Sequence, residues 1–378
     1  MAIPPTSHEN TLGPFQLLRV LGEGGMGTVY LGLDPALNRH VAIKVLRSHA
    51  MARNSATIAK RFLREAQSAA KLNHPHVVTI YSVGRHGGDD ALGLPYIVME
   101  YVEGGSLADR IRRHSPLHWR DAALALRDAL RGLAAAHRAG IVHRDIKPAN
   151  LMCARDAAGT HIIKLADFGL ARLANPSDAE LTFPGAFVGS PGYSAPEQIT
   201  GILHMDGRAD LYSLAATAYA LLTGQPPFIG DDPHEIMERH LKEPFPDVRI
   251  LAPAVHPALQ ALITRASRKQ PHDRFKNAGE MLLVVEDLLA LPVDVPQVTT
   301  PMPPPKRRVA SPEPATRTVG QLESRLAEAR LQSDTPTQLS TLRTLYGMYA
   351  QLDRRDDALR AYREALVVHV KMLAPANN

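Results

Sequence analysis

Three short polar motifs in the middle of the chain restrict its fold more than any other feature. They are His143-Arg144-Asp145, the pair Lys147 and Asn150, and Asp167-Phe168-Gly169. Transfer of a phosphoryl group from ATP needs a carboxylate that orients the attacking hydroxyl, oxygen ligands for magnesium, and a cation near the moving phosphate. Asp145 can supply the carboxylate and Lys147 the cation. Asn150 and Asp167 can supply the ligands, so the chain must fold in a way that brings these side chains together.

A glycine-rich run lies near the start of the chain. Gly22, Gly24 and Gly27 follow the spacing G-x-G-x-x-G between two apolar runs that predict strands. In a dinucleotide-binding fingerprint the glycines open a helix, whereas a strand follows them here. This order favours a hairpin whose backbone N–H groups can approach phosphate oxygens. A plain glycine-rich hairpin turn is the alternative.

A lysine and a glutamate follow in the next two predicted elements. Val41-Ala42-Ile43-Lys44 predicts a strand that ends in the lysine, and the apolar period from Thr57 to Leu72 predicts a helix that carries Glu65. Either charge alone is typical of a solvated surface. However, a lysine held against phosphates needs an anionic partner, and Glu65 is the first helical carboxylate downstream of Lys44.

Taken in order, these motifs resemble those of the eukaryotic-like serine/threonine protein kinases, most closely the bacterial members. The resemblance runs from about Phe15 to about Leu291. It implies an α+β fold of two lobes, a small, mainly β N-lobe and a mainly α C-lobe. It also implies ATP and Mg²⁺ as cofactors and serine or threonine residues of protein substrates as acceptors.

The resemblance assigns a role to each motif residue. The residues implied to cover or bind the phosphates are Gly22, Gly24, Gly27, and Lys44 with its partner Glu65. The residues implied to act on the transferred group are Asp145 as the catalytic base, Lys147 as the neutralising cation, and Asn150 and Asp167 as magnesium ligands.

The run from Tyr96 to Val102 predicts a buried strand that leads into a linker. In the family this segment holds the gatekeeper, here Met99, and the hinge. The carbonyl of Glu100 and the backbone groups of Val102 would pair with adenine. The side chains implied to enclose the adenine ring are Leu21, Val29, Ala42 and Met152. Ordinary core packing is the alternative for each of them, because apolar residues fill interiors by default.

The activation segment would run from Asp167 to Glu197. Bacterial relatives place an autophosphorylation site at the position of Thr182, with Ser177 as the weaker candidate, and an unmodified loop threonine is the alternative. A phosphate there could order the loop against Arg144. Ser190 stands where most family members carry threonine, and its hydroxyl could still bond to the side chains of Asp145 and Lys147.

Two further pairings are expected to be structural. By the same resemblance, Arg274 should form an ion pair with Glu197, and Asp210 should brace the backbone of the His143-Arg144-Asp145 motif. N-capping of a helix is the plain alternative for Asp210.

Composition excludes several other classes of protein. The single cysteine, Cys153, rules out an internal disulfide framework and a cysteine-rich zinc site. The net charge is +5, but the basic residues are dispersed, which argues against a nucleic-acid partner. The longest apolar helix candidate, Leu211 to Leu222, is too short for a membrane span, and the N-terminus lacks a signal-peptide pattern. We therefore expect a cytoplasmic enzyme.

The composition of the sequence changes after Leu291, where prolines become frequent and predict a semi-extended linker. A helical period returns at Val319. The expected organisation is an N-terminal tail at 1–14, the kinase domain at 15–291, the linker at 292–318, a helical module at 319–372 and a tail at 373–378.

The helical module resembles a tetratricopeptide repeat. Leu342, Leu345 and Tyr349 have the spacing of its first helix, and Ala358, Tyr362 and Ala365 that of its second, although Tyr346 replaces a small residue. A generic helical hairpin is the alternative. Either would serve as an interaction module for partner docking or for a homodimer.

Two other functions compete with the protein kinase hypothesis. A small-molecule phosphotransferase would share the H-x-D-x-x-x-x-N loop, but the Val41 to Lys44 strand and Ala195-Pro196-Glu197 resemble protein kinases. A catalytically inactive scaffold would lack some of the motif residues. All of them are present, namely Lys44, Glu65, Asp145, Asn150 and Asp167.

Overall fold

In the computed structural model, the described residues are 11–24, 27–46, 55–86, 93–114, 116–168, 190–202, 205–291 and 313–334, with the further positions 337–338, 341–342, 344–345, 357, 361 and 364. The contacts divide the chain into two units. The first comprises Met1–Phe245 and Val255–Leu291, and the second Pro246–Ala254 and Pro292–Asn378.

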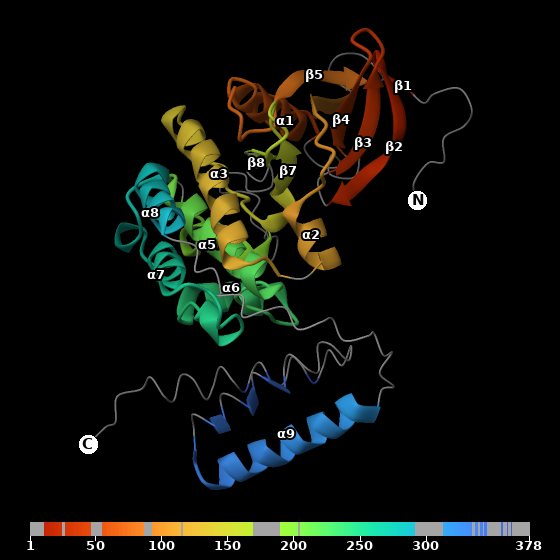
Figure 1. Cartoon of the computed structure of the whole chain (residues 1–378). Helices are drawn as coiled ribbons and strands as arrows, with labels where there is room; N and C mark the ends of the chain where they lie inside the picture. Colours follow the sequence, from red (N-terminus) through yellow and green to blue (C-terminus); the bar gives the residue numbers. More distant parts are fainter. Residues whose placement is uncertain are drawn as a thin grey trace. The chain divides into compact units, whose positions relative to one another are not determined.

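A six-stranded antiparallel sheet builds the N-terminal part of the first unit (Figure 1). Its strands are β1 (Thr11–Leu12), β2 (Phe15–Gly24), β3 (Gly27–Asp34), β4 (Arg39–Leu46), β5 (Ile80–His86) and β6 (Leu94–Glu100), in the order β1-β2-β3-β4-β6-β5. Strand β4 lies inside the sheet, and its Val41 and Ile43 are fully buried. This burial explains the continuous apolar run that ends at Lys44.

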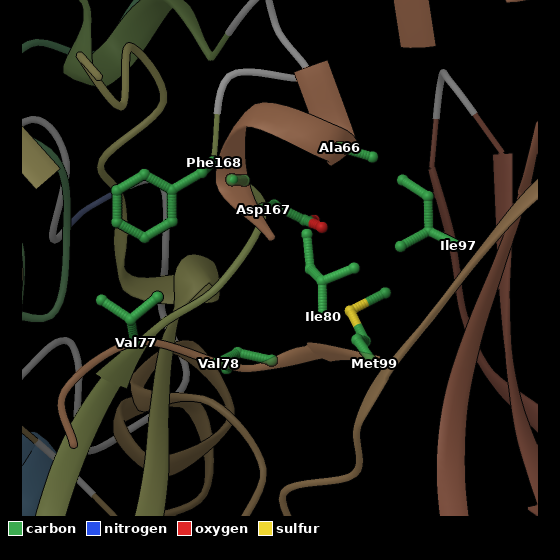
Figure 2. Close-up of a pocket in the computed structure, with 9 residues that line it drawn as sticks. Ala66, Val77, Val78, Ile80, Ile97, Met99, Asp167 and Phe168 are labelled. Atoms are coloured by element: carbon green, nitrogen blue, oxygen red, sulfur yellow. The ribbon is translucent and has the colours of Figure 1, made fainter. Parts of the chain in front are cut away.

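Helix α1 (Ser55–Ala69) packs on β5 and β6. Its Phe62 and Ala66 form a buried cluster with Leu46 and Ile97 of the sheet. Figure 2 shows Ala66, Ile97, Ile80 and Met99 around a small cavity of about 20 Å³, which has room for about one water molecule. The helix that carries Glu65 is thereby held against the strand that leads to the hinge.

Helices dominate the rest of the first unit. They are α2 (Leu107–His114), α3 (Trp119–Arg138), α4 (Pro196–Ile199), α5 (Arg208–Thr223), α6 (Pro233–Lys242), α7 (Pro257–Ala266) and α8 (Ala278–Ala290), with the hairpin β7 (Leu151–Arg155) and β8 (His161–Leu165). Helix α5 is buried on every side from Ala209 to Thr223, as its nearly continuous apolar sequence predicts. Gly224 ends it in the left-handed conformation, with a φ of 82°. The two-lobed fold expected from the sequence is confirmed.

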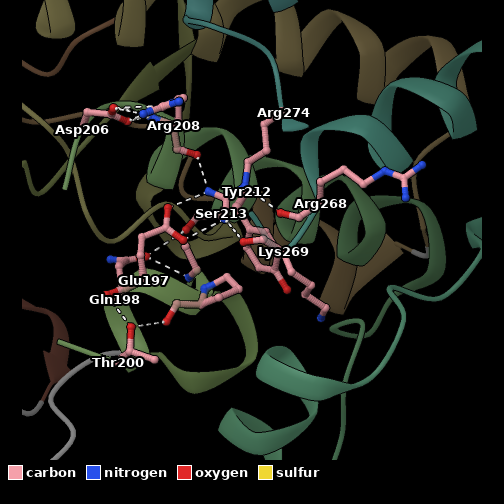
Figure 3. A network of polar contacts seen from close by, with 12 residues as sticks. Glu197, Gln198, Thr200, Asp206, Arg208, Tyr212, Ser213, Arg268, Lys269 and Arg274 are labelled. Carbon is pink, nitrogen blue, oxygen red and sulfur yellow. Dashed lines mark hydrogen bonds and ion pairs between the residues drawn. The ribbon is translucent and has the colours of Figure 1, made fainter. Parts of the chain in front are cut away.

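The predicted pair between Arg274 and Glu197 is also confirmed. Two parallel hydrogen bonds of 2.6 and 2.7 Å join the guanidinium to the carboxylate, and both side chains are buried. Arg274 also donates to the backbone carbonyls of Arg208, Arg268 and Lys269 (Figure 3). The pair therefore ties the end of the activation segment to α5 and to the loop before α8.

In the second unit, α9 spans Glu313–Leu331 and buries Val319, Leu326 and Ala329. The helix begins inside the segment that we expected to be linker. Pro314 permits this start, because the first turn of a helix has no use for the N–H group that proline lacks. Beyond it, Leu342, Leu345 and Ala361 are buried, and Arg330 forms an ion pair with Glu364. The tetratricopeptide assignment stays a prediction.

Removal of the Glu197 carboxylate would leave the Arg274 charge buried and unpaired. We therefore expect Glu197→Ala to lower the free energy of unfolding by about 3–5 kcal/mol, measured by urea denaturation. The matched control is Lys242→Ala, which removes an ion pair between the exposed side chains of Lys242 and Glu238 and should change nothing measurable. Equal effects in the two variants would show that the buried pair has no special role.

Candidate active site

The loop that carries His143-Arg144-Asp145 is held by the carboxylate of Asp210, which is fully buried in the first turn of α5. Its oxygens accept the backbone N–H of His143 at 2.8 Å and that of Arg144 at 2.7 Å. The ring of His137 bonds to the same carboxylate at 2.8 Å. The bracing role predicted for Asp210 is confirmed, whereas sequence reasoning missed His137, since no motif distinguishes it among the chain's histidines.

The environment of Asp210 keeps it ionised. Burial alone would raise its pKa, but the hydrogen bond and charge of His137, with the hydrogen bond from the backbone N–H of His143, hold the pKa below its ordinary value. The loop also contains a strained residue, because Arg144 has a φ of 65°. The backbone N–H groups of His143 and Arg144 both bond to Asp210. These bonds stabilise a backbone conformation that residues other than glycine rarely adopt.

The side chain of His143 joins this loop to the Asp167-Phe168 motif. Its Nε2 lies 2.9 Å from the carbonyl oxygen of Ala166, and its ring centroid is 4.4 Å from that of Phe168. Burial lowers the pKa of His143, so the ring is neutral. It donates from Nε2 to Ala166 and accepts the backbone N–H of Asp145 at Nδ1. The side chain of His143 thus connects the His143-Arg144-Asp145 motif to the Asp167-Phe168 motif.

The side chains of the predicted catalytic loop meet directly. Asp145 Oδ2 lies 2.9 Å from Lys147 Nζ and accepts a hydrogen bond of 3.0 Å from Asn150 Nδ2. Asn150 Nδ2 also donates to the Asp145 carbonyl at 2.7 Å. Lys147 Nζ reaches Ser190 Oγ at 2.7 Å, so the expected bond between these two side chains is confirmed. The structure records no bond between Ser190 and Asp145 in the described part of the chain.

Lys44 of β4 forms an ion pair of 2.8 Å with Asp167. Burial alone would raise the pKa of Asp167, but the charge and hydrogen bond of Lys44 hold it below its ordinary value. This contact joins the six-stranded β-sheet to the helical lobe. Glu65 lies partly buried on α1, and its pairing with Lys44 stays a prediction.

All of the predicted adenine-contacting side chains lie in one apolar cluster. Ala42, Met99 and Val102 form its buried centre together with Val78, and the partly buried Leu21, Val29 and Met152 pack against it. Sequence reasoning missed Val78, which precedes β5 and is bound through its backbone to Leu165. Figure 2 shows Val78, Met99, Asp167 and Phe168 among the residues that line the small cavity.

The three motif glycines differ in what surrounds them. A Cβ atom on Gly27 would lie 2.1 Å from the carbonyl oxygen of Val45, so β4 itself requires glycine there. A Cβ on Gly22 or Gly24 would meet nothing within 4 Å. Among the residues that the structure describes, no contact explains these two glycines, which is consistent with a backbone that a ligand approaches.

Several predicted features lie outside the described residues. Among them are Thr182, Ser177 and Gly169.

Of the residues that are described, no group of three or more His, Cys, Asp or Glu side chains could hold a metal ion. None of the described helices is long and apolar enough to cross a membrane.

Comparison with known proteins identifies the family. The model of the protein kinase domain matches residues 15–283. The chain is 41% identical over 277 residues to the serine/threonine-protein kinase PknB of Mycolicibacterium smegmatis, covering 73% of this chain and 43% of that protein. It is 40% identical over 269 residues to the serine/threonine-protein kinase PrkC of Bacillus subtilis, covering 71% of this chain and 39% of that protein. The match therefore spans about two fifths of the length of these relatives.

Solved structures agree with the fold. The crystal structure of the kinase domain of Mycobacterium tuberculosis PknI is 29% identical in sequence, with a TM-score of 0.55. The match covers 73% of this chain and 97% of that one.

The low pKa of Asp210 makes a pH-dependent contribution to stability. A carboxyl group with a lowered pKa in the folded protein stabilises the fold fully when the pH is above its ordinary pKa of 3.8. This contribution is lost as the pH falls through the pKa of the folded state. We expect Asp210→Asn to lower the free energy of unfolding by about 1–3 kcal/mol near neutral pH, because an amide cannot accept all of these donors. The deficit should shrink in acid.

Urea denaturation at a series of pH values measures this difference. Asp287→Asn, which alters an exposed carboxyl on α8, is the matched control and should follow the wild type. A deficit for Asp210→Asn that stays constant down to acid pH would contradict the assignment of a charged Asp210.

Proposed function

Because this chain belongs to the protein kinase family, we propose that it transfers the γ-phosphate of ATP to serine or threonine residues of proteins. The observation that carries the proposal is the direct hydrogen bonding of Asp145 to Lys147 and Asn150, with Ser190 on the same lysine. The names of the PknB and PrkC relatives point to the same acceptor class.

Asp145 would act as the catalytic base. Lys147 and Asn150 both contact its Oδ2, which fixes the carboxylate and leaves Oδ1 for the hydroxyl of an acceptor. Lys147 would also neutralise charge on the transferred phosphate. Its bond to Ser190 ties this cation to the segment that leads into η4 (Pro191–Tyr193), where an acceptor chain would lie.

Adenine would enter the apolar cluster around Ala42 and Met99, and the backbone carbonyl of Glu100 and the backbone groups of Val102 would pair with its edge. The side chain of Glu100 forms a 2.5 Å ion pair with Lys164, and its backbone N–H donates to the carbonyl of Thr79 at 2.9 Å, so its carbonyl is the group left for adenine. Gly22 and Gly24 would lie over the phosphates, because nothing in the described part of the chain lies within 4 Å of a Cβ atom built on either glycine. Gly27 would support the same hairpin through its close contact with β4.

Asn150 and Asp167 would hold Mg²⁺, which supplies charge neutralisation at the phosphates. The donor set fits this ion, because Mg²⁺ prefers oxygen ligands and binds through one or two carboxylates plus substrate phosphates. Asn150 uses its nitrogen to bond Asp145, which leaves its amide oxygen available. Asp167 uses Oδ2 to bond Lys44, which leaves Oδ1. Lys44, supported by Glu65, would bind the α- and β-phosphates.

Two finer features belong to the same proposal. Thr182 would be autophosphorylated, and its phosphate would pair with arginine near the catalytic loop. The C-terminal helical module would recruit a protein partner or a second copy of the chain, since a tether makes the second encounter effectively intramolecular. The cytoplasmic location stays a prediction.

The proposal is tested by incubating the purified chain with Mg-ATP and a general protein acceptor. Phosphoserine and phosphothreonine should form, without phosphotyrosine. Asp145→Asn should lower the rate by about 100- to 10,000-fold, the usual contribution of a positioned base. Lys44→Met should also lose activity, and mass spectrometry should find phosphate on Thr182 only where the enzyme is active.

Lys276→Met and Asp287→Asn are matched controls, because both side chains are exposed and distant in sequence from the motifs. Both should retain wild-type rates. Phosphate incorporation that persists in Asp145→Asn would overturn the assignment of the base, and an inactive wild-type chain would favour the scaffold hypothesis.

A further inference from the structure

A groove behind the hinge takes no part in the proposed catalysis. Its volume is about 800 Å³, within the range of roughly 300–1,000 Å³ typical of ligand sites. Five parts of the first unit line it, namely the hinge from Glu100 to Gly104, α2, Leu117 between α2 and α3, the first half of α3, and the β7–β8 hairpin. None of the predicted catalytic or magnesium residues is among the lining residues.

The walls of this groove are fixed by close backbone packing. A Cβ atom on Gly104 would lie 2.2 Å from the carbonyl oxygen of Cys153, so only glycine allows the hinge to approach β7 so closely. The backbone N–H of Cys153 donates to the carbonyl of Gly105 at 2.8 Å. A groove with fixed walls is preorganised, which lowers the entropy cost of binding.

Apolar side chains form much of its surface. They include Leu107 of α2, Leu117, and Leu124 and Ala125 of α3. Leu124 is 39% exposed, although it is a large apolar residue on a helix whose other leucines are buried. The groove therefore offers accessible apolar area to a ligand.

The charges that line the groove leave a surplus of arginine. Two of its acidic residues are neutralised by cations that do not line it, because Glu100 pairs with Lys164 at 2.5 Å and Asp128 with Arg127 at 2.9 Å. Glu103 and Asp121 are the other acidic lining residues. Against them stand the exposed side chains of Arg110 and Arg113 on α2 and Arg155 on β7, with His161 beside them on β8.

The arginines keep donors for a ligand. A guanidinium has five N–H groups. The hydrogen bonds recorded for Arg113 and Arg155 each use one of them, to the backbone carbonyls of Asp109 and Gly159. Arginine pairs readily with carboxylates in two-pronged geometry, so the groove suits an anionic ligand with apolar groups.

From these observations we propose that the groove binds an extended segment of a protein partner in which acidic side chains alternate with apolar ones. Its carboxylates would pair with Arg110, Arg113 and Arg155, and its apolar side chains would cover Leu124. The arginines select against a basic segment, because like charges placed together at an interface oppose binding. The site is a docking surface separate from the acceptor site.

A docked partner and the nucleotide would lie on opposite sides of the hinge and β7, which contribute residues to both sites. Val102 and Met152 pack in the predicted adenine cluster, while Val102 and the neighbouring Cys153 also line the groove. The two ligands can therefore be bound together. The docking proposal does not depend on phosphate transfer, because it is measured as binding without nucleotide.

The test uses the full chain and a short fluorescent peptide of alternating glutamate and leucine, followed by fluorescence anisotropy. The peptide should bind, and the same peptide with lysine in place of glutamate should not. Arg110→Glu combined with Arg113→Glu should weaken binding by at least about tenfold. Arg112→Glu is the matched control, because Arg112 lies on the same helix, is paired with Asp109, and does not line the groove. The Arg112→Glu variant should bind the acidic peptide with the same affinity as the wild type.

Cys153 locates the peptide, because it is the only cysteine in the chain and lines the groove. Burial raises its pKa, so alkylation is measured at mildly alkaline pH. Bound peptide should slow alkylation in the wild type and in Arg112→Glu, but not in the double variant. Failure of the acidic peptide to bind, equal affinities of the double variant and its control, or binding that leaves the alkylation rate unchanged would each overturn the proposal.

Discussion

The buried carboxylate of Asp210 is the interaction on which the geometry of the site depends. It accepts backbone N–H groups from two consecutive residues, and one of them, Arg144, has a strained positive φ. A conformation of this kind costs about 1–3 kcal/mol and persists only where its surroundings enforce it. Because Asp210 lies on the buried helix α5, its hydrogen bonds fix the loop that carries Asp145 to the helical core. His143 then extends this connection through Ala166 to Phe168.

Among the described residues, each buried charged side chain has a partner of opposite charge. Glu197 has Arg274, Asp210 has His137, and Asp167 has Lys44. The first two pairs lie within the helical lobe and fix its architecture. The third joins the two lobes, so the position of β4 relative to Asp167 is coupled to this ion pair, for which the proposed nucleotide and its metal ion would compete.

Local motifs predicted the parts of the site that depend on one short segment or on a resemblance to a known family. The Arg274–Glu197 pair, the bracing by Asp210, and the bond between Lys147 and Ser190 all occur where they were expected. The contact of Lys44 with Asp167 was not foreseen, because spacing along the chain says nothing about the distance between two lobes. His137 and the groove were missed for a related reason, since five separate segments supply the groove's lining and no periodic pattern marks it.

In the proposed mechanism, the loop held by Asp210 positions Asp145 for proton transfer, while other residues bind the nucleotide. The most direct measurement is the equilibrium dissociation constant of Mg-ATP for the wild type and for Asp145→Asn, determined by calorimetry. We expect equal dissociation constants, because Asp145 acts only on the acceptor hydroxyl. A dissociation constant that rises in proportion to the loss of rate would contradict this mechanism, and would place Asp145 among the groups that bind the nucleotide.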